Sequence, residues 1–122
     1  RACDAEVVQT FDEDQTYRYA EASGDTMPIH TDAEFAKSVG LPGIIIHGLC
    51  TMAFVSRAAV QAACPDDPSR LTRLAVRFSA PAFPGSTITT RLWKTGDGSW
   101  AFETAAQDGS VVIKDGAAEV AH

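Results

Sequence analysis

The chain has 122 residues, of which 45% are hydrophobic, so it holds one core but is small enough for a partner subunit or a fused second half to be expected. Its net charge of −6 argues against nucleic-acid binding, and no run approaches the roughly 18 apolar residues that span a bilayer. Its three cysteines have no C-x-x-C spacing, which indicates reduced thiols in a cytoplasmic compartment and no zinc site.

The N-terminal third predicts one strand and two helices. Val7 to Phe11 is short and rich in β-prone residues, so it predicts a strand. Glu13 to Ala22 has an acidic first turn and helical apolar spacing, and a glycine follows it. Gly24 to Asp32 contains Gly, Pro and several Asp or Thr residues, which favours a loop. Ala33 to Val39 then predicts a second short helix, closed by the next glycine.

A long apolar segment from Ile44 to Cys64 predicts the central helix of the domain. Its apolar side chains leave few faces for water: Leu49, Met52, Phe54, Val55, Ala58, Ala59 and Val60. A helix that is apolar on most sides is expected to be buried. The prolines from Pro65 to Pro68 end it.

The rest of the chain alternates like a half-buried sheet. Four strands are expected, around Leu74 to Phe78, Ile88 to Leu92, Trp100 to Thr104, and Val111 to Ile113. Hairpin turns at Gly96 to Gly98 and at Asp108-Gly109 make successive strands antiparallel, and Gly116 marks an expected bulge. A long buried helix followed by an antiparallel meander indicates an α+β domain in which a curved sheet wraps the helix.

The loop sequence S-G-D-T-M-P-I-H places a carboxylate, Asp25, five residues before an imidazole, His30. An acid/base reaction near neutral pH uses such a pair, because the carboxylate is ionised and the imidazole takes up or releases a proton at little cost. The alternative is structural: Asp25 caps the following turn and His30 packs against a backbone carbonyl. Spacing by itself leaves both interpretations open.

The start of the central helix carries a second candidate element, Ile46-His47-Gly48. Free N–H groups and the positive dipole end of a helix stabilise an anionic oxygen, and Gly48 lets a ligand approach closely. Otherwise Gly48 permits tight packing on the sheet. Ser56, two turns later, is a candidate substrate-binding residue, although helix serines more often bond a carbonyl of the preceding turn. His47 is expected to be structural, held by a local hydrogen bond.

Taken together, these stretches resemble the MaoC-like, or (R)-specific enoyl-CoA hydratase 2, family of hot-dog proteins. The resemblance rests on S-G-D-T-M-P-I-H, on F-A-K-S-V-G-L-P-G from Phe35, and on I-I-H-G-L-C-T from Ile45, with R-F-S-A-P-A-F-P-G-S-T-I-T-T from Arg77 as a weaker match. It implies a hot-dog fold over residues 1–122, with the sheet wrapped around Gly48 to Cys64. One departure is Met27, where the family usually has Asn.

The family resemblance also implies roles for the candidate residues. Asp25 and His30 would hold a water and add it to a trans-2-enoyl thioester, giving the (R)-3-hydroxyacyl product. Gly48 would donate its N–H to the thioester carbonyl, and Ser56 would help to order the site. The reaction needs no metal and no cofactor. The compartment would be cytoplasmic, or peroxisomal in a eukaryote.

Several alternatives remain open at this level. The substrate is an acyl-CoA or an acyl carrier protein, and the chain is a hydratase or a 3-hydroxyacyl dehydratase. A hot-dog thioesterase and a non-catalytic acyl-binding subunit are further candidates. The chain resembles the catalytic half of double-hot-dog hydratases, so it would pair with itself, with a different subunit, or with a half preceding Arg1.

The charge is distributed unevenly along the chain. Residues 1–56 carry three basic and nine acidic side chains. Residues 57–94 carry six basic and two acidic side chains, and residues 95–122 carry one basic and five acidic side chains. The basic side chains of the middle segment are Arg57, Arg70, Arg73, Arg77, Arg91 and Lys94. They would serve a phosphorylated ligand or, as charge runs more often do, line solvated faces.

Overall fold

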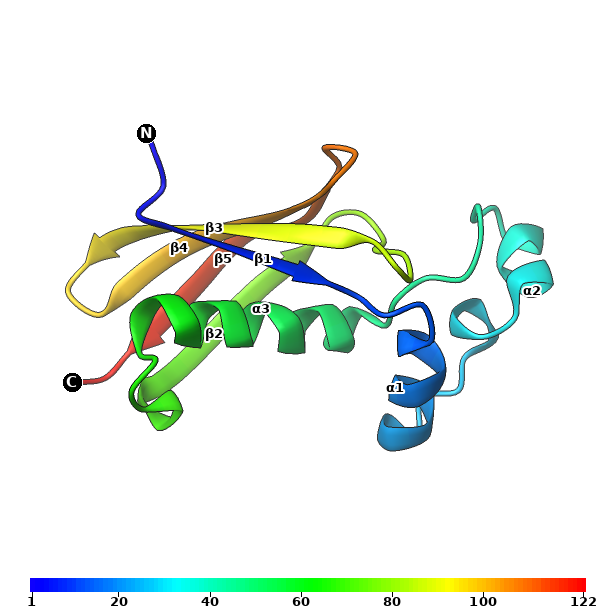
Figure 1. The fold of residues 1–122 in the computed structure, drawn as a ribbon, viewed down its shortest axis with the longest axis horizontal. Helices are drawn as coiled ribbons and strands as arrows, with labels where there is room; N and C mark the ends of the chain where they lie inside the picture. Colours follow the sequence, from blue (N-terminus) through cyan, green and yellow to red (C-terminus); the bar gives the residue numbers. More distant parts are fainter.

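The computed structural model describes residues 1–122 and shows a five-stranded antiparallel sheet with one long helix across one face (Figure 1). The strands are β1 (Ala5–Thr10), β2 (Leu71–Phe78), β3 (Thr87–Gly96), β4 (Ser99–Ala106) and β5 (Val111–Val120). The helices are α1 (Gln15–Ser23), α2 (Ala33–Ser38) and α3 (Gly48–Ala63), with single 3₁₀ turns η1 (Pro28–His30) and η2 (Pro68–Arg70). The α+β hot-dog architecture predicted from the sequence is confirmed. None of the helices has the length and apolar composition of a membrane span.

The strand order is β1-β3-β4-β5-β2, so only three of the four C-terminal strands form the predicted meander. β2 lies at the far edge and pairs with β5 rather than with β3. The prediction that β2 joins a simple meander was wrong, because a hairpin turn determines the pairing only of the two strands that it connects. The link 79–86 is long enough, at up to roughly 3.3 Å per residue, to cross the intervening strands at about 4.8 Å each.

The predicted bulge in the last strand is present beside Gly116. The register of β5 shifts between Lys114 and Ala117, and Asp115 takes a positive φ of 52°. Gly116 itself lies against the ring of Phe102, where an added Cβ would come within 2.5 Å of ring carbons. The missing side chain is therefore what lets this ring pack in the core.

Helix α3 packs one face on the sheet and leaves the other open. The core consists of buried side chains from that face of α3, from the strands and from the residue after β1: Cys50, Val55, Ala59, Ile88, Leu92, Phe102, Val112, Ile113 and Phe11. Leu49, however, is 65% exposed and Met52 is half-buried. The prediction of a helix buried on most sides was therefore wrong for its outer face, because the sheet covers only one side and this chain supplies no second layer.

Short helices gather at the N-terminal end of α3 (Figure 1). α1 starts two residues later than predicted and ends at Gly24, whose φ of 80° is the left-handed conformation that closes many helices. The expected loop from Gly24 to Asp32 contains one 3₁₀ turn, opened by Pro28. α2 begins at the cap Asp32, whose carboxylate accepts from the N–H of Phe35 at 3.1 Å. These caps fix the loop that carries the candidate residues.

Candidate active site

The loop that carries Asp25 is shaped by local hydrogen bonds. The Asp25 N–H donates to Ser23 Oγ at 3.1 Å, and its carboxylate accepts from the N–H of Met27 at 3.3 Å. The Asx turn considered from the sequence is therefore formed. The side chain of Asp25 is nevertheless exposed, so one of its oxygens has room for another partner.

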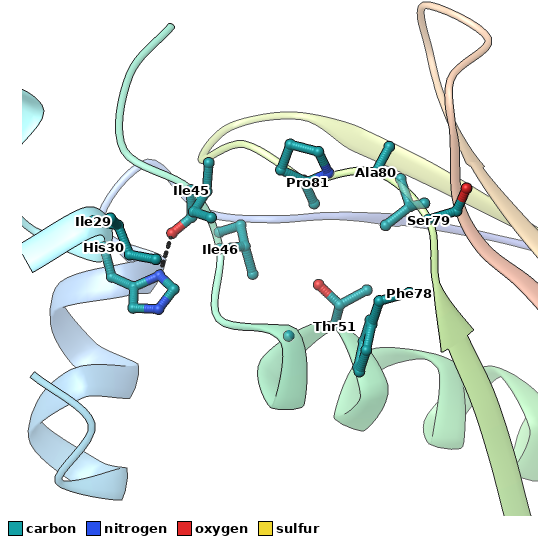
Figure 2. A pocket seen from close by; sticks show the side chains of 12 residues that line it. Ile29, His30, Ile45, Ile46, Thr51, Phe78, Ser79, Ala80 and Pro81 are labelled. Carbon is teal, nitrogen blue, oxygen red and sulfur yellow. Dashed lines mark hydrogen bonds between the residues drawn. The ribbon is translucent and has the colours of Figure 1, made fainter. Parts of the chain in front are cut away.

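His30 is held in one orientation at the end of the 3₁₀ turn. The side chain is only 6% exposed, and its Nδ1 lies 2.8 Å from the carbonyl oxygen of Ile45 (Figure 2). A carbonyl only accepts, so Nδ1 carries the proton and donates. Nε2 is left with its lone pair and is able to accept a proton from a reactant.

His47, the residue before α3, connects the two candidate elements. Its Nε2 donates to the backbone carbonyl of Asp25 at 3.0 Å, and its ring stacks on that of His30 with centroids 3.7 Å apart. The expected structural role fits this geometry, but the bond reaches a residue 22 positions earlier and is not local. His47 Nδ1 is buried and has no partner.

The ring of Tyr19 also lies close to that of His47, with centroids 4.7 Å apart and the planes tilted by 51°. Burial raises the pKa of the Tyr19 hydroxyl, and the nearby Cys50 and Asp25 raise it further. Burial likewise raises the pKa of the Cys50 thiol. Both groups are therefore protonated near neutral pH, and neither offers a thiolate or phenolate nucleophile.

Three side chains with proton-accepting atoms converge at this point: Asp25, His30 and His47 have such atoms within 4.8 Å of one another. A metal would have to lie in the plane of each ligating imidazole at about 2.0 Å. The two rings are stacked at an angle of 17°, so their lone pairs are not directed at a common point. This arrangement suits acid/base chemistry better than metal ligation.

The first turn of α3 presents free donors beside these side chains. The N–H groups of Cys50 and Thr51 donate to the His47 carbonyl, whereas those of Gly48 and Leu49 bond to no acceptor in the chain. Unbonded N–H groups and the helix dipole together favour an anionic oxygen at such an end. A Cβ on Gly48 would lie 3.4 Å from the ring of Phe78, so glycine keeps the approach open.

A cavity of about 400 Å³ opens next to the helix end (Figure 2). It is mainly apolar and is lined by Ile29, His30, Ile45, Ile46, Gly48, Thr51, Phe78, Ser79, Ala80, Pro81, Ala82 and Val112. The link between β2 and β3 closes one wall, where the N–H of Ile46 donates to the Ala82 carbonyl at 2.8 Å. The cavity has room for a small apolar group between His30 and the start of α3.

The sequence candidates are distributed unequally around this cavity. His30 and Gly48 line it; Asp25 does not, but one of its carboxylate oxygens lies within 4.8 Å of a ring nitrogen of His30. Ser56 does not line it: the serine hydroxyl donates to the Ala53 carbonyl at 2.7 Å, as helix serines commonly do. The cavity instead contains Thr51, which sequence analysis missed because it lies inside an apolar helical run.

The basic side chains of the middle segment do not line the cavity, whose lining contains no arginine or lysine. Three of its side chains form ion pairs on the surface: Arg70 with Asp66, Arg77 with Asp115, and Arg91 with Glu6. This is the arrangement expected of solvated faces.

Comparison with known proteins gives a consistent result. Residues 1–116 match the family model described as "MaoC like domain". The chain is 40% identical over 119 residues to a probable enoyl-CoA hydratase 2 of Dictyostelium discoideum, covering 97% of this chain and 40% of that protein. It is also 40% identical over 122 residues to a 3-hydroxyacyl-thioester dehydratase of Mycobacterium tuberculosis, and the match covers 95% of this chain and 42% of that protein.

A solved structure resembles the fold closely. The crystal structure of a MaoC-like dehydratase from Phytophthora capsici superimposes with a TM-score of 0.95 at 37% identity, covering all of this chain and 41% of that one. The chain thus spans about two fifths of the length of these relatives.

Proposed function

The chain belongs to the MaoC-like domain family, whose related members are enoyl-CoA hydratases and dehydratases, and we propose that it hydrates trans-2-enoyl-CoA to (R)-3-hydroxyacyl-CoA or catalyses the reverse dehydration. The observation that carries the proposal is that His30 and Gly48, whose N–H has no acceptor in the chain, line one apolar cavity, while a carboxylate oxygen of Asp25 lies within 4.8 Å of a ring nitrogen of His30. Hydration of an enoyl thioester requires an acid, a base and a polarised carbonyl, and this constellation supplies all three.

The proposed reaction uses one water held between the two side chains. A carboxylate oxygen of Asp25 and a ring nitrogen of His30 lie within 4.8 Å of each other. A single water can bridge that distance with two hydrogen bonds of about 2.8 Å. His30 Nε2 takes one proton while the water oxygen bonds to C3 of the substrate. The electron pair of the double bond moves toward C2 and the thioester oxygen. C2 then takes the proton from His30, so one water is added and nothing else is consumed.

The helix end would stabilise the charge that develops during this step. The thioester oxygen gains negative charge when water attacks C3, and Gly48, which lines the cavity, has an N–H without a competing acceptor. Preorganised donors of this kind are worth roughly 3 kcal/mol each in transition-state stabilisation. The apolar wall formed by Ile29, Ile46 and Pro81 would hold the acyl chain.

A second hot-dog half is the proposed partner, either another copy of the chain or a separate half. Phe78 lines the cavity and Leu49 follows Gly48 on the helix; the two residues are 50% and 65% exposed. The relatives, with more than twice the length of this chain, have room for such a half. We expect its contact with this apolar surface to lengthen the acyl site.

The reaction is tested with the purified chain, its oligomeric state recorded, and crotonyl-CoA or a longer trans-2-enoyl-CoA. Loss of the enoyl-thioester ultraviolet absorbance without release of free thiol supports a hydratase. Release of thiol at the same rate would instead identify a thioesterase. Turnover only of substrates carried on an acyl carrier protein would identify the chain as an acyl-carrier-protein dehydratase. Binding of the substrate without turnover would identify it as a non-catalytic subunit.

A further inference from the structure

The cavity lining contains two hydroxyl side chains that the proposed reaction does not yet use, Thr51 and Ser79, and of these Thr51 is buried. Thr51 is only 2% exposed, and its hydroxyl takes part in no hydrogen bond of the chain; its oxygen is nevertheless not one of the completely enclosed atoms without a partner, which are Gln9 Oε1, Thr16 Oγ1 and His47 Nδ1. Its own N–H donates to the His47 carbonyl at 3.1 Å, but the hydroxyl does not bond the preceding turn as helix threonines often do. The oxygen therefore lies at the small part of Thr51 that stays accessible beside the cavity, and its hydroxyl is free to donate to a molecule bound there.

The position of Thr51 on the helix directs it toward the same point as the free N–H groups. Thr51 follows Gly48 by three residues, so the two share one face of α3. Helix side chains tilt toward the N-terminus, which brings the threonine hydroxyl over the first turn. Figure 2 shows its oxygen turned away from the helix into the space bordered by Ile46 and Pro81.

We propose that the Thr51 hydroxyl is the second donor, beside the N–H of Gly48, to the thioester oxygen of the substrate. Among the residues lining the cavity, Ser79 also carries a hydroxyl, but its side chain is exposed at the end of β2, whereas that of Thr51 lies on the helix. The other wall residues are apolar apart from His30, which faces the reacting water. A thioester oxygen has two lone pairs, so it accepts from the backbone donor and the hydroxyl together. This inference rests on the proposed function, because it names a further group that stabilises its transition state.

The test compares Thr51→Val, which removes the hydroxyl, with Thr51→Ser, which keeps it. We expect Thr51→Val to lower kcat by roughly 10- to 100-fold with KM changed less than about threefold, because the lost donor acts mainly in the transition state. Thr51→Ser should restore most of the rate. The matched control is Thr90→Val: Thr90 is also fully buried, but its hydroxyl bonds Thr104 in the sheet at 2.9 Å, away from the cavity. This control should lose stability and keep its kinetics.

A spectroscopic readout separates this inference from the reaction itself. Butyryl-CoA, carrying a labelled carbonyl, cannot be hydrated, and its carbonyl stretching frequency falls when donors bind the oxygen. We expect a lowered frequency on wild-type protein, a smaller change on Thr51→Val and recovery on Thr51→Ser. Equal kcat and equal carbonyl shift in wild type and Thr51→Val would overturn the role of Thr51. A wild-type chain that binds butyryl-CoA with a lowered frequency but never hydrates enoyl-CoA would overturn the proposed function and leave Thr51 as a donor in a binding site.

Discussion

His47 donates a hydrogen bond from Nε2 to the backbone carbonyl of Asp25 at 3.0 Å, and this bond joins the start of α3 to the loop that carries the carboxylate. The same imidazole stacks on His30. One side chain thus fixes the relative positions of the proposed acid/base pair and of the helix end that would bind the thioester oxygen. The consequences are testable by substitution.

Removal of this link should affect turnover more than binding. His47→Phe keeps a ring close to those of Tyr19 and His30 but leaves the Asp25 carbonyl without its donor. We expect kcat to fall by about 10- to 100-fold, as displacements near 1 Å do, while KM stays within about threefold. Unfolding free energy should fall by roughly 1–3 kcal/mol. Steady-state kinetics and urea unfolding measure both; unchanged kcat in a folded variant would show that His47 does not position the pair.

The two residues that hold and activate the proposed water should each be indispensable. Asp25→Asn and His30→Ala remove the carboxylate and the imidazole, and general acid/base groups typically contribute about 10²- to 10⁴-fold to a rate. Asp25→Asn should unfold at the wild-type temperature because its side chain is exposed. Near-wild-type hydration rates in either variant, measured by enoyl absorbance, would contradict the proposed pair.

A methyl group added at Gly48 should leave the fold intact but slow the reaction. An added Cβ meets only the half-exposed ring of Phe78, at 3.4 Å, so Gly48→Ala is expected to fold. The methyl group would lie at the helix end and shift the substrate oxygen, lowering kcat/KM by roughly 10- to 100-fold. The control is Gly43→Ala, where an added Cβ meets nothing within 4 Å. Equal kcat/KM for the two variants would show that Gly48 has no role in binding the substrate oxygen.

Much of the local structure could be predicted from the sequence, because local signals determine it. Gly24 and Pro28 identify an irregular loop, and the spacing of Asp25 and His30 identifies a candidate pair. The position of β2 could not be predicted in this way, since turn residues fix only neighbouring strands. Thr51 was missed for a related reason: in an apolar run a threonine looks like core, and only its unbonded hydroxyl in a cavity distinguishes it.

Gly116 gives a test of the fold that is independent of the reaction. Gly116→Ala places a Cβ about 2.5 Å from ring carbons of Phe102, which is too close for any well-packed core. We expect a loss of roughly 1–3 kcal/mol, the usual cost of overpacking. Phe102→Leu should recover part of this loss in the double variant, whereas Gly96→Ala, with only an ordinary contact of 3.9 Å, should change little. Thermal unfolding measures all four proteins, and a neutral Gly116→Ala would contradict the packing described here.

The most direct test of the central claim is to run the reaction of crotonyl-CoA in oxygen-18-labelled water and locate the label by mass spectrometry. The account predicts 3-hydroxybutyryl-CoA of the R configuration, with the label in the C3 hydroxyl and an intact thioester. Label found in a free carboxylate, or an S product, would contradict it.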